Sequence, residues 1–453
     1  MQLHIHNTVP GRHIILRSSS ANAKRFPFTF AANLKVMKLS HLSETLIGSE
    51  IVKLGGEIRE RIRKGEHIYN FTVGDFDPNI FPIPKQLEDD IVEAYRQHFT
   101  NYPPGEGSLE LREAVSKFAK QYQGLNYSAD EILIASGGRP LIYALFRTVV
   151  DKGEKVIYAV PSWNNNHYAH FTEAEHVVVE AKAENGFMPT ADDLRPYIQD
   201  ASFLALCSPQ NPTGTTFRKD DLEAICEMIV AENKRRGDGK KLYVMFDQMY
   251  WHLTYDGIQH YDPVTLNPEM RPYTVFIDAI SKCFAATGVR VGWSFGPAAV
   301  LNKMKAILSH VGAWAPMPEQ KGLTKYFAET ESIDAYLGHF KAEVAERLRR
   351  IYEGVVQLKN EGFAVDAVVP EAAIYLTVKF DLAGKQTSDG NKLGTQADVT
   401  SYLLQNASLA VVPFYAFGAA KSSPWYRLSV GTCKKEEINE MLQKLKTALE
   451  GLH

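Results

Sequence analysis

The chain has 453 residues, of which 45% are hydrophobic and 23% are charged, and its formal net charge is −3. This length is sufficient for two domains with cores of their own, and the small net charge argues against nucleic acid or an anionic membrane as the main partner. No apolar run is long enough to span a bilayer.

The four cysteines, Cys207, Cys226, Cys283 and Cys433, lie far apart and show no paired spacing. This pattern argues against a disulfide framework and against a cysteine-based metal site, and it is typical of reduced thiols in the cytoplasm. We therefore expect a cytoplasmic protein without a metal.

Residues 1–36 differ from the rest, because they contain no Asp or Glu and several Arg and Lys. An organelle transit peptide has this composition. A basic extension that is disordered or not native, placed ahead of a start at Met37, would look the same. We favour the extension, because ordered sequence signals begin right after Met37.

The first helical pattern covers residues 43–64, with Ser43 as the expected N-cap and Gly65 just past its end. Residues 68–73 then predict a strand, and Gly74 after it lets a ligand approach the backbone closely. We expect residues 37–80 to form a helix and a segment that joins a smaller C-terminal domain. Residues 84–99 predict a helix, and Ser108 caps the start of another.

From residue 130 onwards, short apolar runs alternate with helical patterns. Buried strands are predicted at 131–135, 155–160, 176–179, 201–207, 241–246 and 274–280, with a further strand ending at 292–295. Such alternation predicts an α/β domain, over about residues 81–325, with a doubly wound and mostly parallel sheet. In sheets of this kind, ligands bind outside the carboxyl ends of the strands.

Five residues follow these strands at the ends where a ligand would bind, namely Gly138, Trp163, Asn211, Asp247 and Lys282. Each has an ordinary explanation of its own, such as a turn glycine, a half-buried indole or a helix N-cap. It is the coincidence of all five at strand ends that indicates a site. The Gly-Gly-Arg turn before a helix adds backbone amides that can bind an anion.

Lys282 follows a buried apolar run, so burial lowers the pKa of its amine. Such an amine is a nucleophile that can form a Schiff base with a carbonyl. Arg290 lies in the same loop and can fork onto a phosphate. An amine beside a phosphate clamp suits an aldehyde that carries a phosphate, and pyridoxal phosphate is the candidate.

The last part of the chain begins with a long helical pattern over residues 323–360. Strands follow near 375–380, 410–412 and 427–430, a polar loop or hairpin lies at 384–394, and a helix at 435–449 closes the chain. We expect residues 326–453 to form a small α+β domain.

With these motifs in this order, the chain resembles the class I/II aminotransferases of the fold-type I pyridoxal-phosphate superfamily, and among them the bacterial-type aspartate aminotransferase subgroup. The motifs are Asn-Pro-Thr-Gly at 211–214, Asp-x-x-Tyr at 247–250, Ser-Lys-x-x-x-x-Thr-Gly-x-Arg at 281–290 and Arg-Leu-Ser at 427–429. The resemblance runs from about Ser43 to the C-terminus. It implies the fold-type I architecture and a homodimer with shared active sites.

The resemblance also implies roles around the cofactor ring. Lys282 would carry the cofactor and move a proton between the substrate α-carbon and the cofactor. Asp247 would pair with the pyridine nitrogen and keep it protonated. Tyr250 and Asn211 would bind the 3-hydroxyl oxygen, and Trp163 would stack on the ring.

The phosphate would be held by Gly138, Arg139, Ser281 and Arg290, with Tyr102 reaching it from the partner subunit.

The substrate α-carboxylate would be bound by Arg427, helped by Asn211, Trp163 and the backbone of Gly74. A fork-shaped guanidinium matches a carboxylate with two hydrogen bonds.

Several positions depart from the family pattern. Gln248 stands where relatives usually have Glu, a change that we expect to be harmless. Residues 74–81 and 164–167 are also unusual, and these two segments leave the substrate open. Arg139 stands where relatives that use dicarboxylates carry Lys. A cation there could take a distal carboxylate, and it could equally face the phosphate or solvent.

We therefore predict an aminotransferase that moves an amino group from an L-amino acid to a 2-oxo acid, with aspartate or glutamate as the favoured donor. The alternatives on this fold are a carbon–sulfur β-lyase and an aminotransferase for aromatic or other neutral amino acids. A non-enzymatic regulator would need a DNA-binding appendage, which residues 1–36 are too short to supply.

Overall fold

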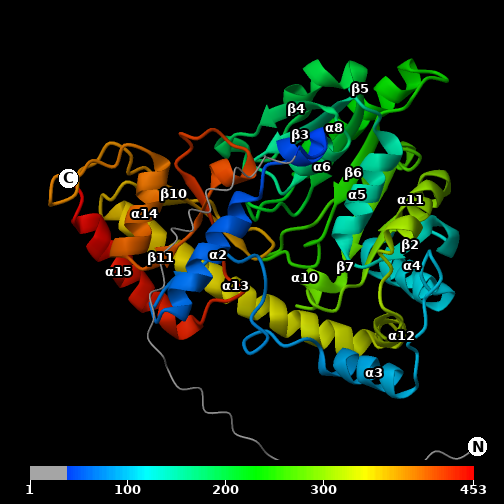
Figure 1. The fold of residues 1–453 in the computed structure, drawn as a ribbon, viewed down its shortest axis with the longest axis horizontal. Coiled ribbons are helices and arrows are strands. Elements are labelled where there is room, and N and C mark those ends of the chain that lie inside the picture. Colours follow the sequence, from blue (N-terminus) through cyan, green and yellow to red (C-terminus); the bar gives the residue numbers. More distant parts are fainter. Residues whose placement is uncertain (1–37) are drawn as a thin grey trace, which may run out of the picture. The chain divides into compact units, whose positions relative to one another are not determined.

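The computed structural model describes residues 38–453, so the predictions for residues 1–36 lie outside the described part of the chain. The chain divides into two units, one that ends at Thr45 and one that runs from Leu46 to His453. The described end of the first unit holds helix α1 (His41–Thr45). Figure 1 shows the helices and strands of the second. None of the described helices is long and apolar enough to cross a membrane.

The largest sheet of the second unit has seven strands in the order β2-β8-β7-β6-β5-β3-β4. The strands are β2 (Ile132–Ala135), β3 (Lys155–Val160), β4 (Glu175–Glu180), β5 (Ala201–Cys207), β6 (Tyr243–Asp247), β7 (Thr274–Ala279) and β8 (Gly292–Phe295). The β4-β3-β5-β6-β7 pairs are parallel, whereas β8 is antiparallel to both β2 and β7. The predicted α/β fold with a mostly parallel sheet is confirmed.

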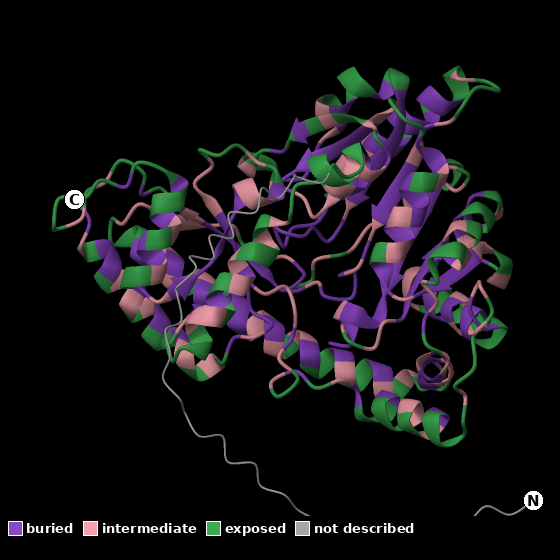
Figure 2. Ribbon diagram, in the orientation of Figure 1, coloured by how far each residue is buried: buried purple, intermediate pink, exposed green. Residues whose placement is uncertain are grey.

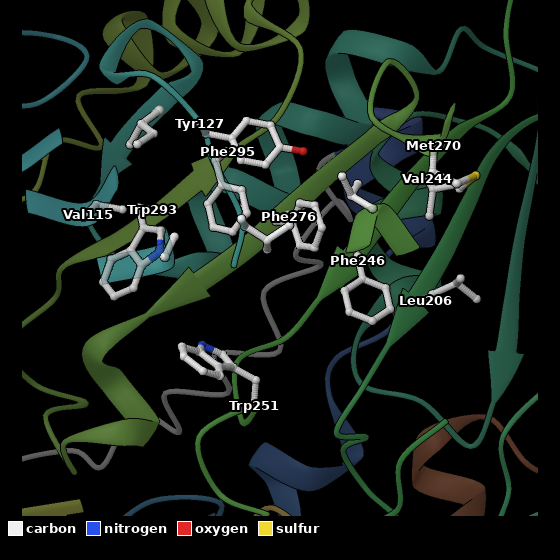
Figure 3. Close-up of a cluster of buried hydrophobic side chains, with 14 of the residues drawn as sticks. Val115, Tyr127, Leu206, Val244, Phe246, Trp251, Met270, Phe276, Trp293 and Phe295 are labelled. Carbon is white, nitrogen blue, oxygen red and sulfur yellow. The ribbon is translucent and has the colours of Figure 1, made fainter. Parts of the chain in front are cut away.

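Helices cover both faces of this sheet, as the alternating strand residues require. Along β5, Phe203 packs in a core with α5 (Gly138–Val149) and α11 (Ala298–Val311), while Leu204 packs in a core with α4 (Leu109–Gln123) and α8 (Lys219–Arg235). Figure 2 shows the strands buried beneath these helices. Figure 3 shows part of the second core, where the Phe276 and Phe295 rings stack with centroids 4.7 Å apart. Shorter or peripheral helices of this part are α3 (Lys85–Arg96), α6 (Asn165–Phe171), α7 (Ala191–Leu194), α9 (Pro263–Leu266), α10 (Ile280–Cys283) and α12 (Met317–Tyr326).

A second sheet lies beyond the long helix α13 (Thr330–Asn360). It is antiparallel, with the order β12-β13-β10-β9, and its strands are β9 (Val365–Ala367), β10 (Tyr375–Phe380), β12 (Val412–Pro413) and β13 (Trp425–Ser429). Helices α13, α14 (Gln396–Asn406) and α15 (Ile438–Glu450) share its core. Strand β1 (Tyr69–Asn70) pairs in parallel with β11 (Leu409–Ala410), which ties residues early in the chain to this part.

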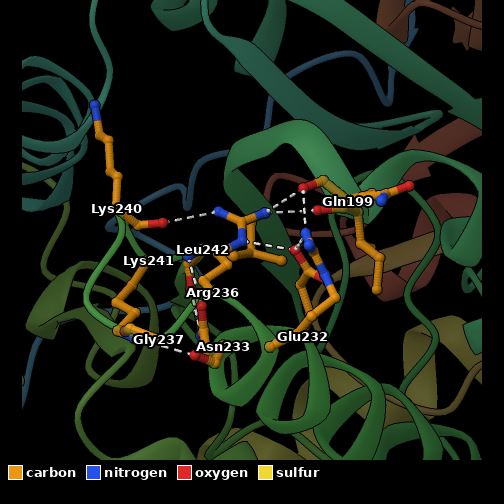
Figure 4. Close-up of polar contacts among 10 residues, drawn as sticks. Gln199, Glu232, Asn233, Arg236, Gly237, Lys240, Lys241 and Leu242 are labelled. Carbon is orange, nitrogen blue, oxygen red and sulfur yellow. Dashed lines mark hydrogen bonds and ion pairs between the residues drawn. The ribbon is translucent and has the colours of Figure 1, made fainter.

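A polar network fixes the approach to β6. At the end of α8, Arg236 Nε donates to Glu232 Oε1 over 2.7 Å (Figure 4). Asn233 exchanges two hydrogen bonds with the Leu242 backbone, of 2.8 and 3.0 Å. The segment that leads into β6, and so to Asp247 at its end, is therefore anchored to the helix before it.

Two predicted helices have different bounds in the structure. The helix predicted over 43–64 is interrupted, and α2 (Glu50–Arg63) begins with Ser49 as its N-cap, whose side chain accepts from Val52 N. The helix predicted over 323–360 is divided between α12 and α13. At the end of α12, Ala328 N donates to the Lys325 carbonyl oxygen and Glu329 N to the Tyr326 carbonyl oxygen. These 3₁₀-type hydrogen bonds tighten the last turn and end the helix, although the apolar pattern continues.

Candidate active site

A cavity of about 540 Å³ opens at the carboxyl ends of the seven-stranded sheet. All but one of the predicted site residues line it: Gly74, Gly138, Arg139, Trp163, Asn211, Asp247, Tyr250, Ser281, Lys282, Arg290 and Arg427. Residues to which the sequence analysis gave no role line it as well, among them Asp75, Thr287 and Tyr375. The cavity therefore gathers residues from both large sheets and from the loop after β1.

Lys282 lies in the short helix α10, directly after the fully buried strand β7. Its Nζ donates to the carbonyl oxygen of Gly74 over 2.5 Å. Burial lowers the pKa of this amine to about 8, with Asp75 raising it and nearby arginines lowering it. Near neutral pH an amine with a pKa in this range is still mostly protonated, but its free-base fraction is far larger than that of an ordinary lysine, and this fraction can act as a nucleophile or a base.

Asp247 is the last residue of β6, and its Oδ1 accepts a hydrogen bond from Met249 N over 3.1 Å. Burial raises the pKa of this carboxyl to about 6. Among residues 38–453, no Lys or Arg forms an ion pair with it. A desolvated carboxylate with one hydrogen bond is stabilised by a cation beside it, so the cavity next to Asp247 suits a ligand with a protonated nitrogen.

Other residues that line the cavity or adjoin it are arranged for an anion. Gly137 has φ of 92°, and a Cβ there would lie 2.2 Å from an Arg290 nitrogen. Arg290 is held by hydrogen bonds to the carbonyl oxygens of Ser136 and Thr287, of 2.9 and 2.7 Å. Gly138 opens α5, whose first backbone amides are free to bind an anion.

Arg139 and Trp163 both line the cavity, and the guanidinium carbon of Arg139 lies over the indole ring, 5.2 Å from its centre. Trp163 lies in the turn after β3 rather than in the strand itself. The indole presents a flat apolar surface next to a cation. This pair can hold a planar ring and a negative group side by side.

Arg427 projects from the centre of β13 and is 1% exposed. Its side chain donates to Asn211 Oδ1 over 3.0 Å and to the Thr72 carbonyl oxygen over 2.7 Å. Its Nε has no hydrogen-bond partner in the described part of the chain. A guanidinium in this state, with no carboxylate beside it, is a receptor for a ligand carboxylate.

Tyr375 is the functional candidate that the sequence analysis missed. Its hydroxyl lies 2.5 Å from that of Tyr250, and its ring centre lies 4.6 Å from the Arg427 guanidinium carbon. The period of two along a strand could have pointed to Tyr375. Thr377 pairs with Arg427 in the sheet, and Tyr375 lies two residues before Thr377, so its side chain is on the same face as that of Arg427.

Tyr102 is the predicted site residue that does not line the cavity. Its side chain is 82% exposed, and its ring packs edge-on against Trp314. Its predicted role in a partner subunit remains a prediction. Within residues 38–453, no group of three or more His, Cys, Asp or Glu side chains is placed to hold a metal ion.

The turn that carries Asn211 depends on Gly214, which has φ of 72°. A Cβ at this position would lie 2.3 Å from the Tyr375 carbonyl oxygen. The Gly214 carbonyl oxygen also accepts a hydrogen bond from Ala372 N over 2.8 Å. This close approach holds the Asn211 turn against β10.

Gly214→Ala is expected to lower the free energy of unfolding by about 3 kcal/mol, because it adds a backbone clash to an unfavourable φ. Gly153→Ala is the matched control, since Gly153 also has positive φ, of 80°, but no atom within 4 Å of the added Cβ. The control should cost only about 1 kcal/mol. Urea unfolding of both variants measures the difference, and equal costs would contradict the close packing at Gly214.

A family model, a related sequence and two related structures that this chain matches are all those of aminotransferases. The family described as aminotransferase class I and II matches residues 66–445. An aspartate aminotransferase of Rhizobium meliloti is 28% identical over 409 residues, which cover 89% of this chain and 94% of the relative. The crystal structure of a Rhizobium meliloti aspartate aminotransferase superposes with a TM-score of 0.82 at 26% identity, covering 92% of this chain and 100% of that one. The Thermus thermophilus aspartate aminotransferase with maleate superposes with a TM-score of 0.80 at 26% identity, covering 91% and 100%.

Proposed function

Since the chain belongs to the class I and II aminotransferases, which depend on pyridoxal 5′-phosphate, we propose that it transfers the amino group of an acidic L-amino acid, aspartate or glutamate, to a 2-oxo acid. The observation that supports the acidic donor is Arg139, a guanidinium that lines the cavity in addition to Lys282, Arg290 and the Arg427 receptor. The Thermus relative was crystallised with maleate, a dicarboxylate, which agrees with this choice.

The residues that line the cavity suit both the pyridine nitrogen and the phosphate of the cofactor. The buried Asp247 carboxylate has no cation beside it in the described residues, and a protonated pyridine nitrogen would supply one. The glycine turn at the start of α5, together with Arg290, leaves room and donors for a phosphate. Trp163 lines the same cavity and offers a surface for the ring.

We assign the following roles to the residues of this chain. When bound, the cofactor supplies an electron sink for the bond that is broken at the substrate α-carbon. Arg427 binds the α-carboxylate and so orients the α-carbon. Lys282 Nζ removes the α-proton and returns a proton during the second half of the cycle. Asp247 keeps the pyridine nitrogen protonated, and Tyr250 and Asn211 bind the ring oxygen.

The remaining assignments concern the phosphate and the assembly. Gly138, Arg139, Ser281 and Arg290 hold the phosphate, and we propose that Arg139 also pairs with the distal carboxylate of an acidic donor. We propose a homodimer in which Tyr102 reaches the phosphate of the partner subunit, and its large exposure in the single chain supports this.

We also retain the predicted domain division, with residues 81–325 as the cofactor domain and 326–453 as the small domain. The pairing of β1 with β11 supports the assignment of residues 37–80 to the small domain. The four cysteines are free thiols, which agrees with a cytoplasmic location.

A panel of amino donors tests the function directly. Each donor is mixed with the holoenzyme, and the loss of the cofactor's visible absorbance is followed without an acceptor. We expect aspartate or glutamate to react with the highest kcat/KM. Pyruvate and ammonia released from a donor with a β-leaving group, without any 2-oxo acid, would indicate a carbon–sulfur β-lyase instead.

Arg139→Ala is expected to lower kcat/KM for aspartate and glutamate on the order of 100-fold more than kcat/KM for alanine, because any loss of phosphate binding is common to all donors and only the acidic donors also lose a charge-assisted hydrogen bond. Arg147→Ala is the control, because Arg147 lies on the same helix but outside the cavity. An equal loss on acidic donors and on alanine would mean that Arg139 serves the phosphate alone.

A further inference from the structure

The loop after β1 brings a second carboxylate into the cavity, and none of the roles above uses it. Asp75 follows Gly74, whose carbonyl oxygen accepts the hydrogen bond from Lys282 Nζ. Asp75 and Lys282 both line the cavity. The Asp75 carboxylate therefore shares the cavity with the amine that the proposed function places at the centre of the chemistry, and its charge acts on that amine.

Asp75 is held in this position from several sides. Its Oδ1 accepts hydrogen bonds from Thr287 Oγ1 over 2.6 Å and from Phe76 N over 2.8 Å. Thr287 belongs to the same loop as Arg290, so the two segments are joined at the cavity. The backbone is fixed as well, because Asp77 N donates to the Gly431 carbonyl oxygen over 2.9 Å.

Gly431 makes this contact geometrically possible. A Cβ on Gly431 would lie 2.0 Å from the Asp75 carbonyl oxygen. The loop can therefore press against the end of β13 only because this residue has no side chain. The position of the carboxylate is thus set by packing on two sides and not by the loop alone.

The charges around Lys282 explain what such a carboxylate can do. Arg139 from α5, Arg290 from the loop before β8 and Arg427 from β13 all disfavour the ammonium form of Lys282, as burial does. Tyr250 faces the amine from the end of β6, with its ring centre 5.8 Å from Nζ. Asp75 is the charged group that acts in the opposite direction and lowers the cost of holding a proton on Nζ.

We propose that Asp75 is a positioning residue for Lys282, whose carboxylate, held by Thr287 and by the contact at Gly431, keeps Nζ basic enough to take up and return a proton. The inference rests on the proposed role of Lys282. Without Asp75, burial and the three arginines would act unopposed, and Nζ would bind its proton more weakly. A weaker base removes the substrate α-proton less readily.

The basicity of Lys282 can be measured in the full-length apoenzyme, independently of turnover. Trinitrobenzenesulfonate modifies unprotonated amines, and peptide mass spectrometry follows the extent of reaction at Lys282 as a function of pH. In Asp75→Asn we expect the midpoint of this profile to fall by about one pH unit. In the holoenzyme, the pH midpoint of the cofactor's visible absorbance should move in the same direction.

Two further variants make the test specific. Asp77→Asn removes a carboxylate from the same loop that bonds to Asn79 and does not line the cavity, so its midpoint should equal that of the wild type. Asp75→Glu retains the charge, so its midpoint should lie close to that of the wild type. An unchanged midpoint in Asp75→Asn, or an equal shift in Asp77→Asn, would overturn the proposal. Because the apoenzyme assay needs no transamination, its result is separate from that of the donor panel.

Discussion

Lys282→Ala is expected to lose transamination by a factor of about 1,000 or more and to lose covalent attachment of the cofactor. Lys282 is half-buried in the cavity with a pKa of about 8, and it lies where the carboxyl end of β7 meets the loop after β1. An alanine can neither bond to the cofactor aldehyde nor carry a proton to the substrate α-carbon. Turnover measurements, with borohydride reduction and peptide mapping of the bound cofactor, test both losses.

Lys341→Ala is a suitable control for this experiment. Burial lowers the pKa of Lys341 as well, but this residue lies on α13 and does not line the cavity. The control should retain turnover and cofactor attachment. A Lys282→Ala enzyme with normal turnover would refute the assignment of the central amine.

Asp247→Asn is expected to lower kcat by about 100-fold or more, because an amide cannot balance the charge of a protonated pyridine nitrogen. The neighbouring contacts should persist, since Asn can still accept the hydrogen bond from Met249 N. Cofactor affinity, from the absorbance of the bound cofactor at increasing concentrations, should fall together with kcat. Unchanged kcat at saturating cofactor would show that the carboxylate does not serve the ring nitrogen.

The same substitution should stabilise the apoenzyme against unfolding, although it lowers kcat of the holoenzyme. Burial raises the folded-state pKa of Asp247 from 3.8 to about 6, so the folded chain holds this proton more tightly than the unfolded chain. The carboxylate therefore destabilises the fold as pH rises from about 4 to 6, and the full cost applies above that range. Asp247→Asn should raise the apoenzyme's free energy of unfolding by roughly 1 to 3 kcal/mol at pH 7 and by almost nothing at pH 4.

Elements whose bounds depend on the residues within them could be predicted from the sequence. Strands β3 and β5 have the predicted bounds, since both are buried on two faces and bounded by turns. The helix predicted over 323–360 failed at its start, because the turn after Tyr326 does not interrupt the apolar pattern. Such a turn is decided by backbone hydrogen bonds that periodicity does not report.

The residues of the cavity also differ in how far the sequence predicts their position. Residues at the ends of predicted strands, such as Asp247 and Lys282, could be placed there from the sequence because the sheet rule is general. Asp75 and Thr287 could not, because they lie 212 residues apart in the chain and meet only through tertiary packing. Their single hydrogen bond is visible only in the folded chain.

The bonds that Arg427 makes without a ligand have a consequence for affinity. Its guanidinium is already fixed between Asn211 and Thr72 and against the Tyr375 ring. Immobilising a long side chain during association usually costs about 0.5–1.5 kcal/mol of conformational entropy, and folding has already met that cost here. An arriving carboxylate thus encounters a preorganised receptor, and rigidity contributes to its recognition as well as charge.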